Sequence, residues 1–355
     1  AFDSIVRGRC WKEDYFYEGT LSMKSKQEQL DELHDLVLVL RQDLPIAELE
    51  KQESVFKQVV RDLVTSFPND ADVSFAIAKI QQEIGLLCKY KSYGVKACTP
   101  LGYAIFLLNE GEGFSFQNHL DFKVELFHVL HIQPCGYAFI ASADEWNMFY
   151  KEERFKEWFA GKDIPEYDRF RINPIPGDVI KVDTTGIVHT AIGCVLEEYA
   201  NVSTDMVQRL YDQNAGRAIP EHFSRTFVEN SVGAITFLEH SSLVSIDASH
   251  TRERIKEQGM EFGRKIILHD TSDFFAMRIF IDPMKSEHII CNDRYLSFYV
   301  TEGEGELKIS DQVLMVKKGD PVLLVPNSSW VLQNTSQDSI LAYSMLGIKQ
   351  EHALK

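Results

Sequence analysis

The first part of the chain carries apolar residues at helical spacing. Between residues 20 and 90 they recur three and four positions apart, which is the period of one helix face. The clearest run is Leu30, Leu33, Val37 and Leu40. Pro45 separates a first helix from a second, and Asp70 or Asp72 can cap a third. We interpret the apolar stripe as core, so this region predicts a small helical bundle.

The period changes at Thr99-Pro100. Beyond this point short β-rich runs alternate with glycines, a rhythm that predicts an antiparallel barrel or jelly roll. An insert rich in aromatic and charged residues follows at 144–170, and we expect it to contain a helix that packs on the barrel. A second β-rich region begins near Gly263. The predicted fold class is therefore mainly β, with two jelly-roll barrels and an N-terminal helical bundle.

An internal repeat links the two β-rich regions. Pro176-Gly177-Asp178, followed by His189, returns as Lys318-Gly319-Asp320, followed by Val331. In both copies the last residue lies twelve positions after the glycine of the turn, as in a decayed duplication. The second copy has Val331 in place of the histidine and Leu296 near the position where an acidic residue is expected. Only the first barrel is therefore expected to hold a metal.

These patterns predict three domains. The first, 1–98, contains the N-terminal segment and the helical bundle. The second, 99–262, is a metal-binding barrel with the insert at 144–170. The third, 263–355, is a metal-free barrel whose expected role is packing. A chain of 355 residues is too long for a single compact core, which agrees with this division.

The composition excludes some classes of partner. There are 37 lysines and arginines against 53 aspartates and glutamates, and the net charge is −16. Without a basic cluster to offset this charge, we expect neither nucleic acid nor membrane as a partner. The six cysteines form no Cys-x-x-Cys pair, and the first residues have no apolar run like that of a secretion signal. We therefore expect a cytoplasmic protein.

Four polar residues have the spacing of a metal site. Gln117 and His119 lie two positions apart, so on a strand they point to the same face. Glu125 follows after a short, turn-like interval, and His189 lies on a later strand. Two imidazoles, one carboxylate and one amide inside a barrel would form a site for a divalent ion such as Zn²⁺ or Mn²⁺. Asp121 is an alternative to Gln117 as the fourth ligand.

These residues resemble the motifs of the cupin superfamily, and more narrowly those of the class I mannose-6-phosphate isomerases. Four ordered stretches carry the resemblance: Phe114–Asp121 (FSFQNHLD), Lys123–Glu125 (KVE), Pro176–His189 (PGD ending in GIVH) and Glu198–Asp212 (EYANVSTDMVQRLYD). It covers about residues 99–350. The resemblance implies a bicupin with one metal site, with zinc as the first choice and manganese, iron or cobalt as alternatives.

The resemblance also implies an activity, the metal-dependent interconversion of an aldose and a ketose, with a sugar phosphate as substrate. Such a reaction moves a proton through an enediol. It implies catalytic roles for Lys123, which moves the proton, for Arg209, which stabilises the oxyanion, and for Asp205, which orients Arg209. The interval between His119 and Glu125 is shorter than in the family, and no residues that would hold the sugar phosphate are recognisable.

Three functions therefore stay open, of which the isomerase is preferred. A second is another metal enzyme, such as a non-haem iron oxygenase or an epimerase of secondary metabolism. His119, Glu125 and His189 form the two-histidine, one-carboxylate set of such oxygenases. A third is a non-catalytic sugar-binding bicupin whose helical bundle docks a partner through an exposed apolar face. The sequence leaves the sugar, the metal and the oligomeric state open.

Overall fold

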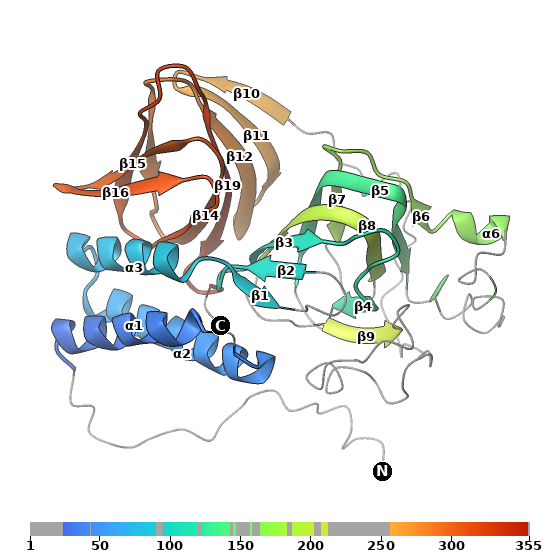
Figure 1. Cartoon of the computed structure of the whole chain (residues 1–355), viewed down its shortest axis with the longest axis horizontal. Coiled ribbons are helices and arrows are strands. Elements are labelled where there is room, and N and C mark those ends of the chain that lie inside the picture. Colours follow the sequence, from blue (N-terminus) through green and yellow to red (C-terminus); the bar gives the residue numbers. More distant parts are fainter. Residues whose placement is uncertain are drawn as a thin grey trace, which may run out of the picture.

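The structure is a computed structural model, and Figure 1 shows two β units beside each other with a group of helices below the second unit. It describes residues 24–42, 44–89, 95–119, 123–142, 145–146, 157, 164–182, 187–201, 207–211 and 256–353.

Three long helices open the described part of the chain. They are α1 (Lys26–Leu40), α2 (Ile46–Ser66) and α3 (Ala71–Ile84). Ser25 and Glu28 form a capping box at the start of α1, in which each side chain binds a backbone N–H group that the helix leaves unpaired. Asp70 caps α3 by accepting hydrogen bonds from the backbone of Asp72 and Val73. The helices thus begin close to the positions that the proline and aspartate signals predict.

The apolar stripes of these helices are core. Leu33, Phe56 and Ile77 are fully buried, and the hydrophobic cluster to which they belong also contains Tyr199 of the first β unit and Tyr295 of the second. The helices therefore pack against both β units instead of forming a separate bundle with its own closed core. This burial confirms the interpretation of the stripe as core.

The first β unit is built from β1 to β9. Their bounds are β1 (Leu87–Lys89), β2 (Val95–Cys98), β3 (Tyr103–Leu107), β4 (Phe116–His119), β5 (Glu125–Ser142), β6 (Arg171–Ile172), β7 (Val179–Val182), β8 (Ile187–Ala200) and β9 (Val207–Tyr211). The strands pair antiparallel throughout.

The two long strands β5 and β8 each run through both layers of this unit. The first half of β5 and the second half of β8 pair with each other and with β7 and β3. The second half of β5 and the first half of β8 pair with each other and with β6 and β4. The ladder is interrupted between Ile132 and Tyr137, where Cys135 has φ 62°, and β8 turns at Gly193, which has φ 61°. These bends let one strand serve two sheets.

The second β unit is built from β10 to β19. Their bounds are β10 (Lys256–Met260), β11 (Gly263–Asp270), β12 (Phe274–Ile281), β13 (Ser286–Ile290), β14 (Arg294–Glu302), β15 (Glu304–Ile309), β16 (Gln312–Lys317), β17 (Pro321–Leu324), β18 (Ser329–Asn334) and β19 (Leu341–Lys349). One sheet has the order β10-β11-β12-β19-β14-β17 and the other β13-β18-β15-β16.

Both units have jelly-roll topology. If β12 to β19 are numbered one to eight, the two sheets of the second unit have the orders 1-8-3-6 and 2-7-4-5, as in two interlocked Greek keys. The first unit gives the same two orders when β5 and β8 are each counted as two strands. The predicted fold class is confirmed: the chain is mainly β, with two jelly-roll units and an N-terminal helical region.

The internal repeat is visible in the backbone. Gly177 and Gly319 have φ values of 95° and 98°, in the left-handed region that glycine adopts most easily. Their N–H groups donate to Val129 and Val300, on equivalent strands, at 2.7 and 2.9 Å. The neighbouring aspartates each accept a hydrogen bond from the backbone three positions earlier. The same turn therefore closes both barrels.

The predicted equivalence of Val331 with His189 is wrong by one residue. Val331 is half-buried, whereas Trp330 and Leu332 on either side of it are fully buried. Since neighbouring strand residues point to opposite faces, Val331 lies on the outer face, and Trp330 and Leu332 fill the barrel. Leu296 does occupy the position of Glu125. Glu125 pairs with Val182 at the end of β7, and Leu296 pairs with Leu324 at the end of β17. Both β7 and β17 are the strands that follow the glycine turn.

The insert at 144–170 lies mainly outside the described residues. Its described part includes the short helix α6 (Pro165–Asp168) and Trp146, which is fully buried against Phe116 and Phe139 of the barrel. This part packs on the barrel as expected, while the predicted domain boundaries stay predictions.

Two further observations bear on the environment of the protein. Within the described residues, no helix is both long and apolar enough to cross a bilayer. Of the described cysteines, Cys88, Cys98, Cys135, Cys194 and Cys291 are free thiols.

The close approach of β5 and β8 at their bends can be tested by adding one methyl group. At Gly136 a Cβ atom would lie 2.5 Å from the carbonyl oxygen of Gly193, so Gly136→Ala should destabilise the protein by about 1–3 kcal/mol. Gly259→Ala is the matched control, because this strand glycine has open space around it. Denaturant unfolding of both variants measures the difference. Equal stability would show that the two strands do not approach each other this closely at Gly136.

Candidate metal centre

Four residues far apart in the sequence meet inside the first barrel. Gln117 and His119 lie on β4, Glu125 is the first residue of β5, and His189 lies on β8. Gln117 is directly opposite His189 in the ladder between β4 and β8. All four are buried, with exposed fractions of 8% for Gln117 and at most 2% for the others. The jelly-roll topology therefore brings the predicted ligand residues together.

The two imidazoles converge on one oxygen of the carboxylate. Nε2 of His119 is 2.9 Å from Oε2 of Glu125, and Nε2 of His189 is 3.3 Å from the same oxygen. The three candidate ligand atoms lie within 4.8 Å of one another. Among the described residues this is the one such group of histidine, cysteine and acidic side chains.

The backbone sets the orientation of both rings. Nδ1 of His119 is 2.9 Å from the carbonyl oxygen of Lys123, and Nδ1 of His189 is 3.2 Å from that of Ile187. An Nδ1–H group that donates to a carbonyl leaves Nε2 with a lone pair, the arrangement that metal-binding histidines adopt.

The donor set fits a divalent cation. Two Nε2 lone pairs that face a carboxylate oxygen repel one another unless a proton or a cation lies between them. In this structure His119 Nε2 and Glu125 Oε2 are buried without a hydrogen-bond partner, although such atoms are normally satisfied. His119, Glu125 and His189 would hold the ion.

Gln117 is positioned to add a fourth ligand. Its Nε2 lies 3.4 Å from His189 Nε2. The oxygen and nitrogen of a glutamine amide are assigned from their neighbours, so a bound cation would favour the flipped amide, with Oε1 toward the site. Asp121, the alternative ligand, lies outside the described residues.

The electrostatics favour the metal-binding protonation states. Burial lowers the pKa of His119, which keeps the ring neutral. Burial works against the charge of Glu125, but the positive charge of a protonated His119 and of Lys123 outweighs it and holds the pKa of this carboxyl well below its usual value. A bound cation would take the place of the His119 proton. Metal binding requires neutral imidazoles and an ionised carboxylate, and the pKa shifts of His119 and Glu125 favour these forms.

Lys123 lies directly behind the candidate ligands. Its ammonium contacts the other oxygen of Glu125, Oε1, and lies 3.7 Å from Oε1 of Glu198. Glu198 in turn is 2.9 Å from Nζ of Lys96. The sequence reading named neither Lys96 nor Glu198 as a site residue. Glu198 could have been found, since it opens the fourth motif stretch, but Lys96 lies on β2 and carries no sequence signal.

The other predicted catalytic residues can be placed only in part. The backbone of Arg209 on β9 pairs with that of Gln117, so this strand runs beside the candidate centre. The side chain of Arg209, and Asp205 as a whole, lie outside the described residues. Their catalytic roles stay predictions.

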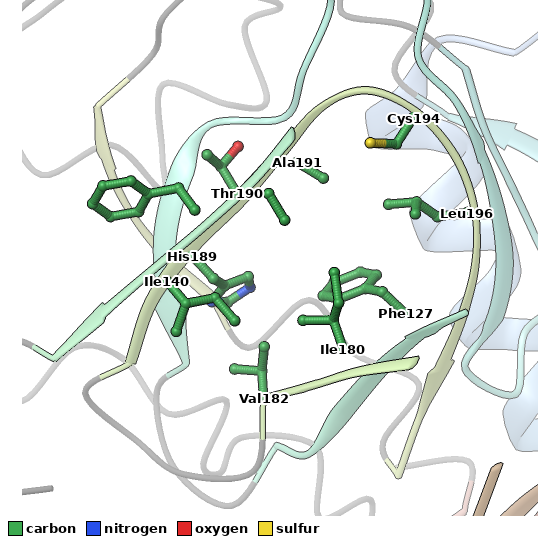
Figure 2. Close-up of a pocket in the computed structure, with 11 residues that line it drawn as sticks. Phe127, Ile140, Ile180, Val182, His189, Thr190, Ala191, Cys194 and Leu196 are labelled. Atoms are coloured by element: carbon green, nitrogen blue, oxygen red, sulfur yellow. The ribbon is translucent and has the colours of Figure 1, made fainter. Parts of the chain in front are cut away.

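An apolar cavity adjoins the centre on the side of His189. Figure 2 shows the His189 ring facing the space between Phe127, Ile140, Ile180 and Val182. The remaining walls are also mainly apolar, and Thr190 is the other polar residue among those that line the cavity. The space is barely large enough for a single water molecule, so it is a small packing gap and not a substrate pocket.

The matching position of the second barrel has no such centre in its described residues. Its interior is lined by apolar side chains such as Leu296, Phe298 and Leu332. Glu287 is a half-buried acidic residue of this barrel, and burial raises the pKa of its carboxyl to about 7. It accepts a hydrogen bond from Tyr343.

Neither a protein-family profile nor a curated protein matches the chain. Similar solved structures include a mannose 6-phosphate isomerase from Bacillus subtilis, with 15% identity and a TM-score of 0.45 over 69% of this chain and 74% of that one. A mutant oxalate decarboxylase from Bacillus subtilis has 14% identity and a TM-score of 0.47 over 75% and 76%.

A formate complex of the oxalate decarboxylase from Lactobacillus farciminis has 11% identity and a TM-score of 0.45 over 76% of this chain and 85% of that one. At these values the likeness decides nothing about chemistry, which has to be argued from the residues of the site.

Metal binding should stabilise the protein. Zinc added to chelator-treated protein at one hundred times its dissociation constant should raise the free energy of unfolding by about 2.7 kcal/mol. Glu125→Gln should lose most of this gain, since it removes the central oxygen ligand. Glu287→Gln, which alters a half-buried carboxyl of the second barrel, should keep it. Thermal unfolding with and without zinc provides the comparison, and an equal response of both variants would contradict the site.

Proposed function

We propose that the protein is a metal-dependent enzyme that interconverts an aldose and a ketose in its first barrel. The observation that carries this proposal is the position of Lys123. Its side chain is 2% exposed and its ammonium lies on Glu125, next to the two histidines. A buried proton-carrying group beside a cation site is what a proton transfer between adjacent carbons requires.

The residues of the site have two separate roles, metal binding and proton transfer. Gln117, His119, Glu125 and His189 would hold the ion, and a divalent cation there supplies positive charge that stabilises an enediol oxyanion. Once the Lys123 ammonium has given up one proton, its Nζ lone pair can take the proton from one carbon, and the ammonium so formed returns it to the neighbouring carbon. Because all five residues are almost completely buried, bulk water is kept from Nζ, and the proton can return to the substrate.

We take the substrate to be a sugar phosphate or a close relative, and zinc to be the metal. In a chain with a net charge of −16, an anionic substrate depends on local cations, and Lys96 and Lys123 both lie inside the first barrel. Arg209 is the third cation that we propose for this role, since its strand pairs with β4 beside the centre. Such a substrate is consistent with the proposed cytoplasmic location.

A second candidate, an iron-dependent oxygenase, is favoured by the donor set. His119, Glu125 and His189 match the two-histidine, one-carboxylate set of these enzymes. The gap beside His189 holds little more than one water molecule and does not favour either substrate. The isomerase ranks higher because Lys123 has a clear role in proton transfer and no comparable role in oxygen chemistry.

The third candidate, a binding protein whose helices dock a partner, loses its main support. It requires an exposed apolar face on the helices, but their apolar residues are buried against the two barrels. Among the described residues of these helices, the exposed large apolar side chains are Leu38 on α1, 60% exposed, and Val55 on α2, 36% exposed.

The deciding experiment is hydrogen exchange in D₂O. Zinc-loaded protein is incubated with hexose, pentose and heptose phosphates, and NMR follows deuterium entering at C2 of the aldose or C1 of the ketose. We expect deuterium to enter one substrate, because Lys123 exchanges its protons with solvent between turnovers. Glu125→Gln should abolish this exchange, and Glu287→Gln should retain it.

The opposite outcome is equally informative. If zinc binds stoichiometrically and no sugar takes up deuterium, the isomerase is excluded. Oxygen consumption by iron-loaded protein would then support the second candidate.

A further inference from the structure

A buried row of alternating charges leads away from the candidate metal centre. It runs from Glu125 to Lys123, then to Glu198 and finally to Lys96. The side chains of Lys123, Glu125 and Glu198 are at most 4% exposed, and that of Lys96 is 11% exposed. Ionic groups are kept in such a place only when each has an opposite charge beside it.

The two oxygens of Glu125 have different partners. Oε2 faces Nε2 of both His119 and His189, while Oε1 is in contact with the Lys123 ammonium. A cation held by the two histidines therefore meets Oε2 first. The contact with Lys123 determines whether Oε1 can also bind the cation.

Lys123 is shared between two carboxylates, and Glu198 is shared between two lysines. Nζ of Lys123 contacts Glu125 closely and lies 3.7 Å from Glu198, while Nζ of Lys96 lies 2.9 Å from Glu198. Lys96 is also held above the ring of Phe106, 5.0 Å from its centre. The closer Lys96 holds Glu198, the less Glu198 can draw Lys123 away from Glu125.

We propose that Glu198 and Lys96 are positioning residues that control how firmly Lys123 occupies Oε1 of Glu125. By this means they determine whether Glu125 offers one oxygen or two to a divalent metal. With Oε1 occupied, Glu125 binds through Oε2 alone and leaves room at the metal for two substrate oxygens. The inference rests on the proposed function, since it assigns the coordination mode of the same site.

The test compares two substitutions that push Lys123 in opposite directions. In Lys96→Met, Glu198 turns to Lys123 and draws it from Glu125, so Oε1 becomes free and zinc should bind about 10-fold more tightly. In Glu198→Gln, Lys123 is left with Glu125 alone, and zinc should bind about 10-fold more weakly. A tenfold change in metal affinity is the lower end of what is seen when a residue that contacts a metal ligand is replaced. Competition with a chromophoric chelator measures both dissociation constants.

Cobalt substitution reports the coordination mode directly. The visible absorption of bound Co²⁺ loses intensity when a further oxygen binds, so Lys96→Met should show weaker bands and Glu198→Gln bands like those of the unaltered protein. Lys96→Arg should restore both the zinc affinity and the spectrum. Lys181→Met is the control. Lys181 lies on strand β7 between the buried residues Ile180 and Val182, so its side chain points away from the barrel interior. This substitution should change neither the zinc affinity nor the cobalt spectrum.

A purely structural role for these residues predicts a different pattern. If Lys96→Met and Glu198→Gln both weaken zinc binding, or if Lys181→Met matches Lys96→Met, the inference is overturned. This result can be told apart from failure of the proposed function, because neither readout needs turnover. Opposite shifts in affinity without deuterium exchange would retain the positioning role and reject the isomerase.

Discussion

The site depends on the buried carboxylate of Glu125, whose two oxygens have different partners. Lys123 contacts one of its oxygens, and His119 and His189 face the other. An ionised carboxylate buried without such partners would cost several kcal/mol. The cluster can therefore exist only if β4, β5 and β8 are held in register, and the remainder of the first barrel provides that register.

The jelly roll meets this requirement through two strands that each belong to both sheets. The close contact of Gly136 with Gly193 lets β5 and β8 bend together and stay paired on both sides of the bend. As a result, the beginning of β5 and the beginning of β8 come to lie at the same level of the barrel as β4. The second barrel has the same strand order, but an apolar interior with Leu296 where the first has Glu125.

The two barrels are joined through the same strand that supports the site. Glu198 of β8 points into the first barrel, and its neighbour Glu197 points outward to the second. The fully buried Glu197 accepts hydrogen bonds from Tyr103 and His128 of the first barrel and from Ser344 of the second. The second barrel, which lacks a comparable polar centre in its described residues, thus fixes the outer face of the strand that carries His189.

The sequence by itself determined the fold class and the candidate ligands, because both depend on local signals. Helical spacing, glycine turns and the repeated Gly-Asp turn are short-range patterns, and Gln117, His119, Glu125 and His189 lie within motifs. Only the tertiary structure decided which residues support them. Lys96 approaches Glu198 because β2, β3 and β8 lie side by side. Likewise, the outward position of Val331 reflects a slip of one residue in strand register, which burial fixes and spacing along the chain does not.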